Sequence, residues 1–187
     1  MSTCEWPSND PQMLEYHDTE WGNPVHDDRK WFEFIVLDAF QAGLSWRTIL
    51  HKRENFRNAF DHFEPEVVAG YDENNIQELM NNPGIIRNQL KIRSAVINAK
   101  AFLKIQEEFG SFDNYIWKFT NGNVEHHGLT ALSEMPAKTE LSDRISKDLI
   151  KRGFKFVGST IVYAFLQAAG MVNDHLTHCF RYKELRG

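Results

Sequence analysis

Apolar residues recur at helical spacing along most of the chain. Between residues 28 and 42 they lie at positions 32, 35, 36, 39 and 40, which is the spacing of one helix face. Asp27 or Asp28 can cap this helix, and Ser45 can cap a second one that we expect to reach about Glu54. A long helix is expected over residues 87–109, with an apolar stripe at 92, 96, 99 and 103 and a stop at Gly110.

Shorter helices are expected in the rest of the chain. They span residues 64–70, 72–80, 113–119, 142–152 and 158–170, followed by a last turn that begins at 173 or 174 and reaches Cys179. Residues 120–140 are polar and contain two glycines and a proline, which predicts a loop. Neither an alternating strand pattern nor an internal repeat is visible. The pattern therefore predicts an all-α protein.

Length and composition narrow the class of protein. A chain of 187 residues predicts a single domain. The longest apolar run, Ile161 to Leu166, is far shorter than the roughly 20 residues that a membrane helix needs. No apolar core precedes the first basic residue, Arg29, so we expect no signal peptide. Two cysteines exclude a disulfide scaffold, and together these features predict a cytoplasmic protein with no membrane partner.

Charge is distributed unevenly along the chain. The net charge of −5 disfavours a strongly basic protein that binds nucleic acid non-specifically. Residues 84–106 nevertheless carry five bases and no acid, and a second basic run covers residues 147–155. These runs are compatible with one basic face that binds a polyanion. The alternative is an ordinary helix face exposed to solvent.

Large aromatic residues gather in the first quarter of the chain. They are Trp6, Tyr16, Trp21, Trp31 and Trp46. Tryptophan is most often part of a core. Several such residues beside polar neighbours can instead line a pocket that stacks flat ligands.

Four cysteine and histidine residues form a candidate metal site. His175 and Cys179 are four positions apart, so on a helix both side chains would share one face. Cys4 and His17 lie near the other end of the chain, and the four complete a Cys2His2 set, which is typical of tetrahedral structural zinc. Buried structural cysteines with hydrogen-bonded histidines, or a disulfide between the two cysteines, are the alternatives.

A proline and a glycine mark a hairpin between two expected helices. Pro83 ends the first helix, and Gly84 permits a tight backbone. Backbone N–H groups at the start of the next helix would then form an anion site, with Arg87 and Lys91 adding charge. Such a helix–hairpin–helix holds a DNA phosphate without reading sequence, whereas an ordinary helix–helix turn is the alternative.

Longer motifs connect these features to a known family. They are Cys4 with Trp6, Tyr16-His17-Asp18, Glu20-Trp21-Gly22, Gln41 to Trp46, Lys52 to Asn55, Gly84 to Asn88, Lys151 to Gly158 and Val172 to His175. Together they strongly resemble the 3-methyladenine DNA glycosylase I family, over Cys4 to about Cys179.

The resemblance implies the architecture and the cofactor. The fold would be the helix–hairpin–helix DNA glycosylase fold, all-α in two lobes with the base pocket between them. Residues 1–187 would form one glycosylase domain, with a zinc-binding lobe made from the N- and C-terminal segments and the helix–hairpin–helix at about 73–109. One structural Zn²⁺ would staple the termini through the family's four ligands, Cys4, His17, His175 and Cys179.

The resemblance also implies a function in DNA repair. The family flips 3-methyladenine out of alkylated double-stranded DNA and hydrolyses its N-glycosidic bond, which leaves free 3-methyladenine and an abasic site. The implied base-binding residues are Trp6, Tyr16, Trp21, Asp38 and Trp46, with Asp38 as the catalytic residue. The implied DNA contacts are Gly43 and Leu44 at the gap left by the base, and Gly84, Ile85, Ile86, Arg87, Asn88 and Lys91 at phosphate. Nothing in the sequence indicates a dimer, so we expect a monomer.

Asp38 departs from the family pattern, which typically has Glu at this position. The carboxylate is kept but is shorter by one methylene, about 1.5 Å at most. It must approach the base by a backbone shift, act through a water, or lose the contact. A non-catalytic DNA- or damage-binding module of the same fold is therefore an alternative, and a zinc-stapled protein with no DNA role is a further one.

Overall fold

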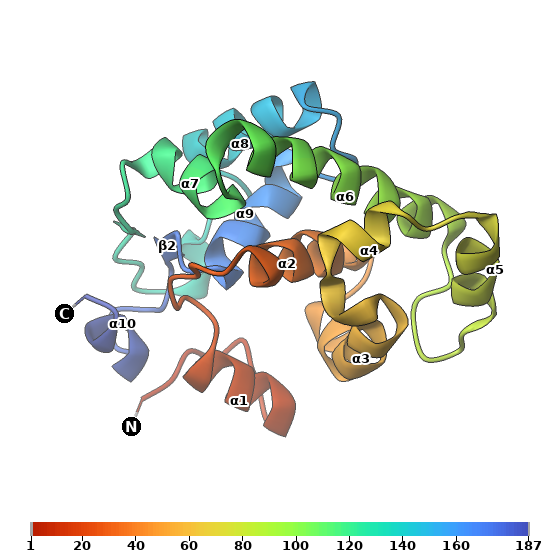
Figure 1. The fold of residues 1–187 in the computed structure, drawn as a ribbon. Helices are drawn as coiled ribbons and strands as arrows, with labels where there is room; N and C mark the ends of the chain where they lie inside the picture. Colours follow the sequence, from red (N-terminus) through yellow and green to blue (C-terminus); the bar gives the residue numbers. More distant parts are fainter. Residues whose placement is uncertain (1, 187) are drawn as a thin grey trace.

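A central helix, α2 (Asp28–Gln41), organises the fold. The computed structural model describes residues 2–186. Figure 1 shows α2 in the middle of the molecule, beneath the long helix α6 (Gln89–Phe109) and in front of α9 (Ser159–Ala168). All ten residues from Trp31 to Phe40 are buried, so α2 is enclosed on every side. The sequence predicted only one buried face, because charged and polar residues interrupt its apolar pattern.

The other helices surround this axis. They are α1 (Pro11–Thr19), α3 (Trp46–Ala59), α4 (Pro65–Ala69), α5 (Glu73–Asn81), α7 (Phe112–Trp117), α8 (Glu140–Lys151), α10 (Phe180–Glu184) and the short 3-10 turns η1 (Asp61–Phe63), η2 (Lys118–Thr120) and η3 (Leu132–Glu134). Two two-residue strands, β1 (Glu125–His126) and β2 (Val172–Asn173), pair in parallel, with Glu125 opposite Val172. The predicted mostly helical fold is confirmed, and this small strand pair is the addition to it.

Helix caps explain why several boundaries were predictable. Asp27 Oδ1 accepts from Lys30 N at 2.8 Å at the start of α2, and Ser45 Oγ accepts from Thr48 N at 3.2 Å at the start of α3. Gly110 ends α6 with φ +83°, which a residue with a side chain rarely adopts. The predicted starts of α2 and α3 and the end of α6 are therefore confirmed, although α3 continues five residues beyond the expected Glu54.

Two terminal elements differ from the sequence interpretation. Helix α1 was not predicted; it begins after Asp10, whose carboxylate accepts from two backbone amides, with Pro11 in its first turn. The last turn predicted through Cys179 is not helical. Residues 174–179 form an irregular turn, and the final helix, α10, begins only at Phe180.

The chain ends meet at one side of the molecule. Phe180 N donates to Ser2 O at 3.0 Å, and Figure 1 shows α1 and α10 as neighbours near the two termini. The segment after α1 packs tightly on the end of α9, because a Cβ at Gly170 would lie only 2.2 Å from the carbonyl carbon of Asn23. Within the described part, no helix is both long and apolar enough to cross a membrane.

Candidate active site and metal centre

An aromatic cavity lies between α1, α2 and α9. Its volume is about 200 Å³. Its lining includes every residue that the sequence analysis assigned to the base pocket, namely Trp6, Tyr16, Trp21, Asp38 and Trp46. The structure therefore brings together side chains that are spread over 40 positions of the chain.

The aromatic rings of the cavity are already in contact with one another. The ring centroids of Tyr16 and Trp46 are 5.4 Å apart, and those of Trp6 and Trp21 are 5.1 Å apart. A base inserted between two parallel rings needs them about 7 Å apart, twice the contact distance of about 3.5 Å. A flat ligand would therefore stack on the cavity side of these rings rather than between Tyr16 and Trp46.

Three buried polar atoms at the cavity have no partner in the described structure. They are Asp38 Oδ2, Trp6 Nε1 and Trp46 Nε1. A buried polar group without a hydrogen bond costs about 1–3 kcal/mol. Two donors and one acceptor that remain unpaired around one cavity are the arrangement expected of a site whose partner is a ligand.

Burial controls the charge of Asp38. Asp38 is 2% exposed, and desolvation raises the pKa of its carboxyl group well above the usual value; the positive charge of Arg53 opposes this shift. Arg53 is itself buried and pairs with two carboxylates, through Nη1 to Glu20 Oε2 at 2.7 Å and Nε to Glu33 Oε1 at 2.6 Å. Asp38 therefore lacks a directly bonded cation, and a positively charged ligand would provide one.

Seven further lining residues were not assigned to the cavity by the sequence. They are Met13, Gln41, Leu132, Met135, Ala164, Gln167 and Ala168. In sequence these residues look like ordinary core or loop positions, because apolar side chains on a helix face pack in a core far more often than in a site. They come from α1, α2, α9 and the segment around η3, whose proximity is a property of the tertiary fold.

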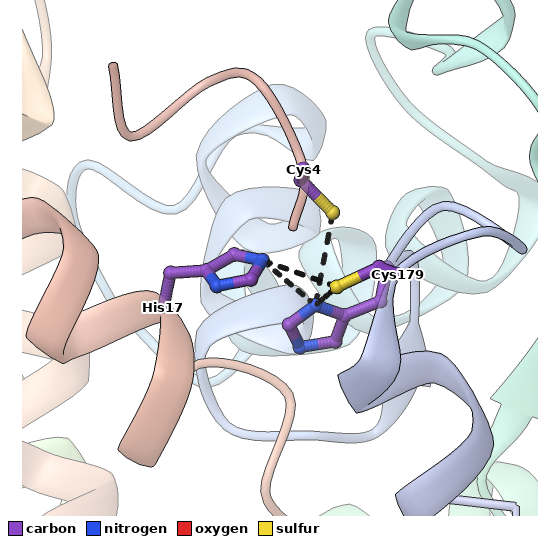
Figure 2. A group of neighbouring side chains, drawn as sticks. Cys4, His17 and Cys179 are labelled. Carbon is purple, nitrogen blue, oxygen red and sulfur yellow. Dashed lines mark hydrogen bonds between the residues drawn. The ribbon is translucent and has the colours of Figure 1, made fainter. Parts of the chain in front are cut away.

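The four predicted metal ligands converge in a second buried site (Figure 2). All four are buried, and their ligand atoms lie within 4.8 Å of one another. His17 Nε2 is 3.1 Å from His175 Nδ1. Cys179 Sγ lies 3.6 and 3.7 Å from these two nitrogens, and Cys4 Sγ lies 3.8 Å from His175 Nδ1. Tetrahedral zinc with bonds of about 2.0 Å to nitrogen and 2.3 Å to sulfur requires about 3.3 Å and 3.5 Å for these pairs. The cluster therefore has the size of a tetrahedral metal site.

Hydrogen bonds fix the tautomer of both histidines. His17 Nδ1 lies 2.7 Å from Asp18 Oδ1, and His175 Nε2 lies 2.9 Å from the carbonyl oxygen of Trp21. The Asp18 carboxylate and the Trp21 carbonyl are acceptors, so His17 Nδ1 and His175 Nε2 carry the protons. The lone pairs of His17 Nε2 and His175 Nδ1 therefore face the cluster. Burial lowers the pKa of His175 to about 4, which keeps this ring neutral and able to bind a metal ion.

The prediction that His175 and Cys179 share one face of a helix is wrong. Both residues lie in the irregular turn that precedes α10. The Cys179 amide donates to Leu176 O at 2.7 Å, which folds this turn so that the two side chains meet. Both cysteines are free, so the disulfide alternative is not formed.

The metal-ligand cluster and the aromatic cavity share a wall. The centroid of the Trp21 ring is 4.6 Å from that of His175, and the Trp6 centroid is 5.4 Å from that of His17. Trp6 and Trp21 therefore contact a candidate metal ligand on one side and line the cavity on the other. Order in the cluster fixes this wall of the cavity.

The loop after α2 presents an apolar tip to solvent. Gly43 has φ +78°, and Leu44 is 41% exposed, unlike most large apolar side chains in this protein. Lys91 supports the loop from below, because its ammonium group donates to Phe40 O at 2.8 Å and to Ala42 O at 2.5 Å. Lys91 was expected to contact DNA phosphate; it is instead buried and bonded within the protein.

The predicted hairpin between α5 and α6 is held by α3. Lys52 Nζ and Asn55 Nδ2 both donate to Gly84 O at 3.3 Å. Ile85 is buried, Arg87 is exposed, and Asn88 caps α6 by accepting from Lys91 N. A Cβ at Gly84 would lie 3.0 Å from Asn82 Oδ1 and 3.2 Å from Asn55 Cβ, closer than ordinary contact, so the close packing of the two segments favours glycine here.

A second hairpin lies between α8 and α9, in the family motif Lys151 to Gly158, to which the sequence analysis assigned no contact. Gly153 has φ +97°, and Phe154 and Val157 are buried, which anchors the hairpin in the core. Asn98 of α6 holds its tip through two hydrogen bonds to the Lys155 backbone, at 2.7 and 3.0 Å. The Lys155 side chain is exposed and forms no ion pair with any described residue.

The chain is similar to known proteins along nearly its whole length. The family model described as methyladenine glycosylase matches residues 6–182. The DNA-3-methyladenine glycosylase 1 of Escherichia coli K12 is 47% identical over 182 residues, 97% of each chain. The DNA-3-methyladenine glycosylase of Haemophilus influenzae is 43% identical over 94% of this chain and 95% of its own.

Solved structures show the same architecture. A crystal structure of 3-methyladenine DNA glycosylase I superimposes with a TM-score of 0.93 at 46% identity and covers 96% of this chain and 98% of its own. A Staphylococcus aureus structure that is described as the basis of 3-methyladenine recognition has a TM-score of 0.93 at 38% identity, with 96% of both chains covered.

Proposed function

Because the chain belongs to the methyladenine glycosylase family, we propose that its aromatic cavity receives a flipped 3-methyladenine nucleotide. The protein is a DNA glycosylase that hydrolyses the N-glycosidic bond of 3-methyladenine in alkylated DNA. The main support for assigning the cavity to the flipped base is its unpaired polar atoms. Asp38 Oδ2, Trp6 Nε1 and Trp46 Nε1 are buried around a space lined by aromatic rings.

The lesion itself matches the chemistry of this cavity. Methylation at N3 places a positive charge on the adenine of the nucleotide, which weakens the bond between N9 and C1′. Electron-rich aromatic faces attract such a flat cation. In the reaction the N9–C1′ bond breaks and its electron pair stays on the base, which leaves as neutral 3-methyladenine. Water adds its oxygen to C1′, and the proton that it loses passes to solvent. The protein must mainly extrude, hold and select the nucleotide.

We propose that Asp38 is the catalytic carboxylate of this site. Burial disfavours its charged form, and a cationic base placed beside it reverses that penalty. The interaction is strongest while the base carries its charge in a cavity shielded from water. Asp38 lines the cavity and its buried Oδ2 has no hydrogen-bond partner, which supports a direct contact despite the side chain being shorter than the family's Glu.

Zinc is the metal that we propose for the four-residue cluster. Two thiolates and two imidazoles in a tetrahedral arrangement are typical of structural Zn²⁺, and the cluster has the spacing and histidine tautomers that this ion needs. All four positions would be filled by protein side chains. Zinc would therefore staple the termini into one lobe beside the cavity and would supply no chemistry to the reaction.

Three exposed segments form the proposed DNA-binding surface. The Leu44 loop and the α8–α9 hairpin both contact α6, through Lys91 and Asn98 respectively, and these residues are seven positions, or about 10 Å, apart along the helix. The α5–α6 hairpin precedes the same helix. Leu44 would fill the gap left by the flipped base, while the two hairpins would hold phosphate on either side.

Release of the free base tests the proposed function. The protein is incubated with DNA that a simple alkylating agent has methylated, and the released bases are identified by mass spectrometry. We expect 3-methyladenine to be released, and release to fall in Asp38→Ala and Trp46→Ala. Normal release by both variants in folded form would show that another site performs the reaction. The non-catalytic alternative predicts binding of methylated DNA without release.

A further inference from the structure

A buried carboxylate behind the cavity orients one of its lining residues. Asp174 is 1% exposed and follows β2. Its Oδ1 lies 2.6 Å from His127 Nδ1, and its Oδ2 accepts from the hydroxyl of Tyr163 and, at 2.8 Å, from Gln167 Nε2. Three side chains, two from α9 and one from the segment after β1, therefore donate to one carboxylate, and Gln167 is the member of this network that lines the cavity.

The network leaves Gln167 a single orientation. A carboxylate only accepts hydrogen bonds, so the nitrogen end of the amide must face Asp174. The same Nε2 lies 3.3 Å from the sulfur of Met135, which is a weak acceptor and also lines the cavity. Both amide hydrogens are therefore engaged, whereas Gln167 Oε1 accepts from no described residue. A turned amide would place its oxygen against the Asp174 carboxylate, which is unfavourable.

We infer that Gln167 is a specificity-determining residue that presents Oε1 to the exocyclic amino group of an adenine-type base. An oxygen that can only accept favours N6, which carries two hydrogens. It repels the O6 of a guanine- or hypoxanthine-type base, because two acceptors would then face each other without a proton between them. The inference rests on the proposed assignment of the cavity as the lesion site. In this arrangement Gln167 selects an adenine-type base, whereas Asp38 recognises its positive charge.

Two free bases that carry different groups at position 6 test this role. Intrinsic tryptophan fluorescence is titrated with 3-methyladenine and with 3-methylhypoxanthine, in which a carbonyl replaces the amino group. We expect the wild-type protein to bind 3-methyladenine at least tenfold more tightly. Gln167→Met, which has a similar shape and no amide, should weaken 3-methyladenine binding about tenfold and reduce the preference to within about threefold.

Controls distinguish this role from a structural one. Gln77→Met makes the same chemical change on the exposed side of α5 and should keep the wild-type preference. Thermal melting and metal content establish that Gln167→Met is folded. Equal binding of both bases by the wild-type protein overturns the inference even if the variant does not fold. So does a folded Gln167→Met protein that keeps the full preference, which would assign selection to another group such as Asp38.

Failure of the cavity assignment gives a different result. In that case the wild-type protein binds neither base, and base release from methylated DNA is insensitive to Gln167→Met. If the cavity is correct and the inference about Gln167 is not, 3-methyladenine binds but its preference over 3-methylhypoxanthine does not depend on Gln167.

Discussion

Replacing Asp38 by Asn should make the protein more stable and less active at the same time. The side chain keeps its size but loses its charge, in a position that is 2% exposed and lacks a directly bonded cation. Because burial raises the pKa of Asp38 in the folded state, its stabilising contribution is complete below the unfolded value of 3.8 and is lost as pH rises through the folded pKa. At pH 7 the ionised form is therefore a cost to folding.

The sizes of both effects follow from the contacts of this one carboxylate. Removing an unpaired buried charge should stabilise the free protein by about 1–3 kcal/mol at pH 7, or a few degrees in melting temperature for a chain of this length. Loss of one charged hydrogen bond to the cationic nucleotide is worth about 1.5–3 kcal/mol, so kcat/KM should fall about 10- to 150-fold.

Two assays examine this prediction. Thermal melting is measured from pH 5 to 8, and single-turnover release of 3-methyladenine is measured over the same range. Any rise of wild-type kcat/KM with pH that follows the ionisation of Asp38 should be absent from the Asp38→Asn profile. Glu107→Gln, which removes an exposed charge on α6, should change neither property. An Asp38→Asn protein with wild-type kcat/KM at every pH would show that this carboxylate does not act on the base.

Three further predictions concern the metal cluster, the buried ion pairs and the DNA surface. Cys179→Ala should lose the bound zinc and lower the melting temperature, as checked by atomic absorption and calorimetry; full zinc content would exclude this ligand set. Arg53 lowers the pKa of Glu20 to about 2, so that stability is present above pH 4.5 and is lost as pH falls toward 2. Glu20→Gln should flatten this acid limb in urea titrations, and an unchanged limb would remove Glu20 as its source. Lys155→Ala should weaken duplex binding and reduce the slope of log affinity against log salt by about one, whereas Lys183→Ala on α10 should leave the slope unchanged.

Periodicity and capping made much of the helical framework predictable. The apolar spacing that led to α2 and α6 is strong over many turns, and Ser45 and Gly110 mark boundaries that depend on local backbone chemistry alone. Helix α1 was missed because its sequence is largely polar, with only two of its nine residues, Met13 and Tyr16, forming buried apolar contacts. The structure of such a helix depends on tertiary packing more than on its own pattern.

The candidate site was predictable where chemistry is unusual and unpredictable where it is ordinary. Cys4 and His17 could be linked to the distant C-terminal pair because that combination of donors has few other uses. Gln167 and Met135 could not, because amides and apolar side chains are common in loops and helices, and their role depends on Asp174 lying behind them. The prediction that Lys91 contacts DNA phosphate is wrong because it rested on the charge of the surrounding sequence. A basic stretch indicates a solvated surface, but this ammonium group closes the end of α2.

A crystal structure with free 3-methyladenine would locate the base relative to the unpaired atoms of the cavity. We predict that the base stacks on the cavity side of Trp46, with Asp38 Oδ2 within hydrogen-bonding distance of its edge and Gln167 Oε1 beside its amino group. A base bound elsewhere, with the cavity empty and Asp38 Oδ2 still unpaired, would contradict this prediction.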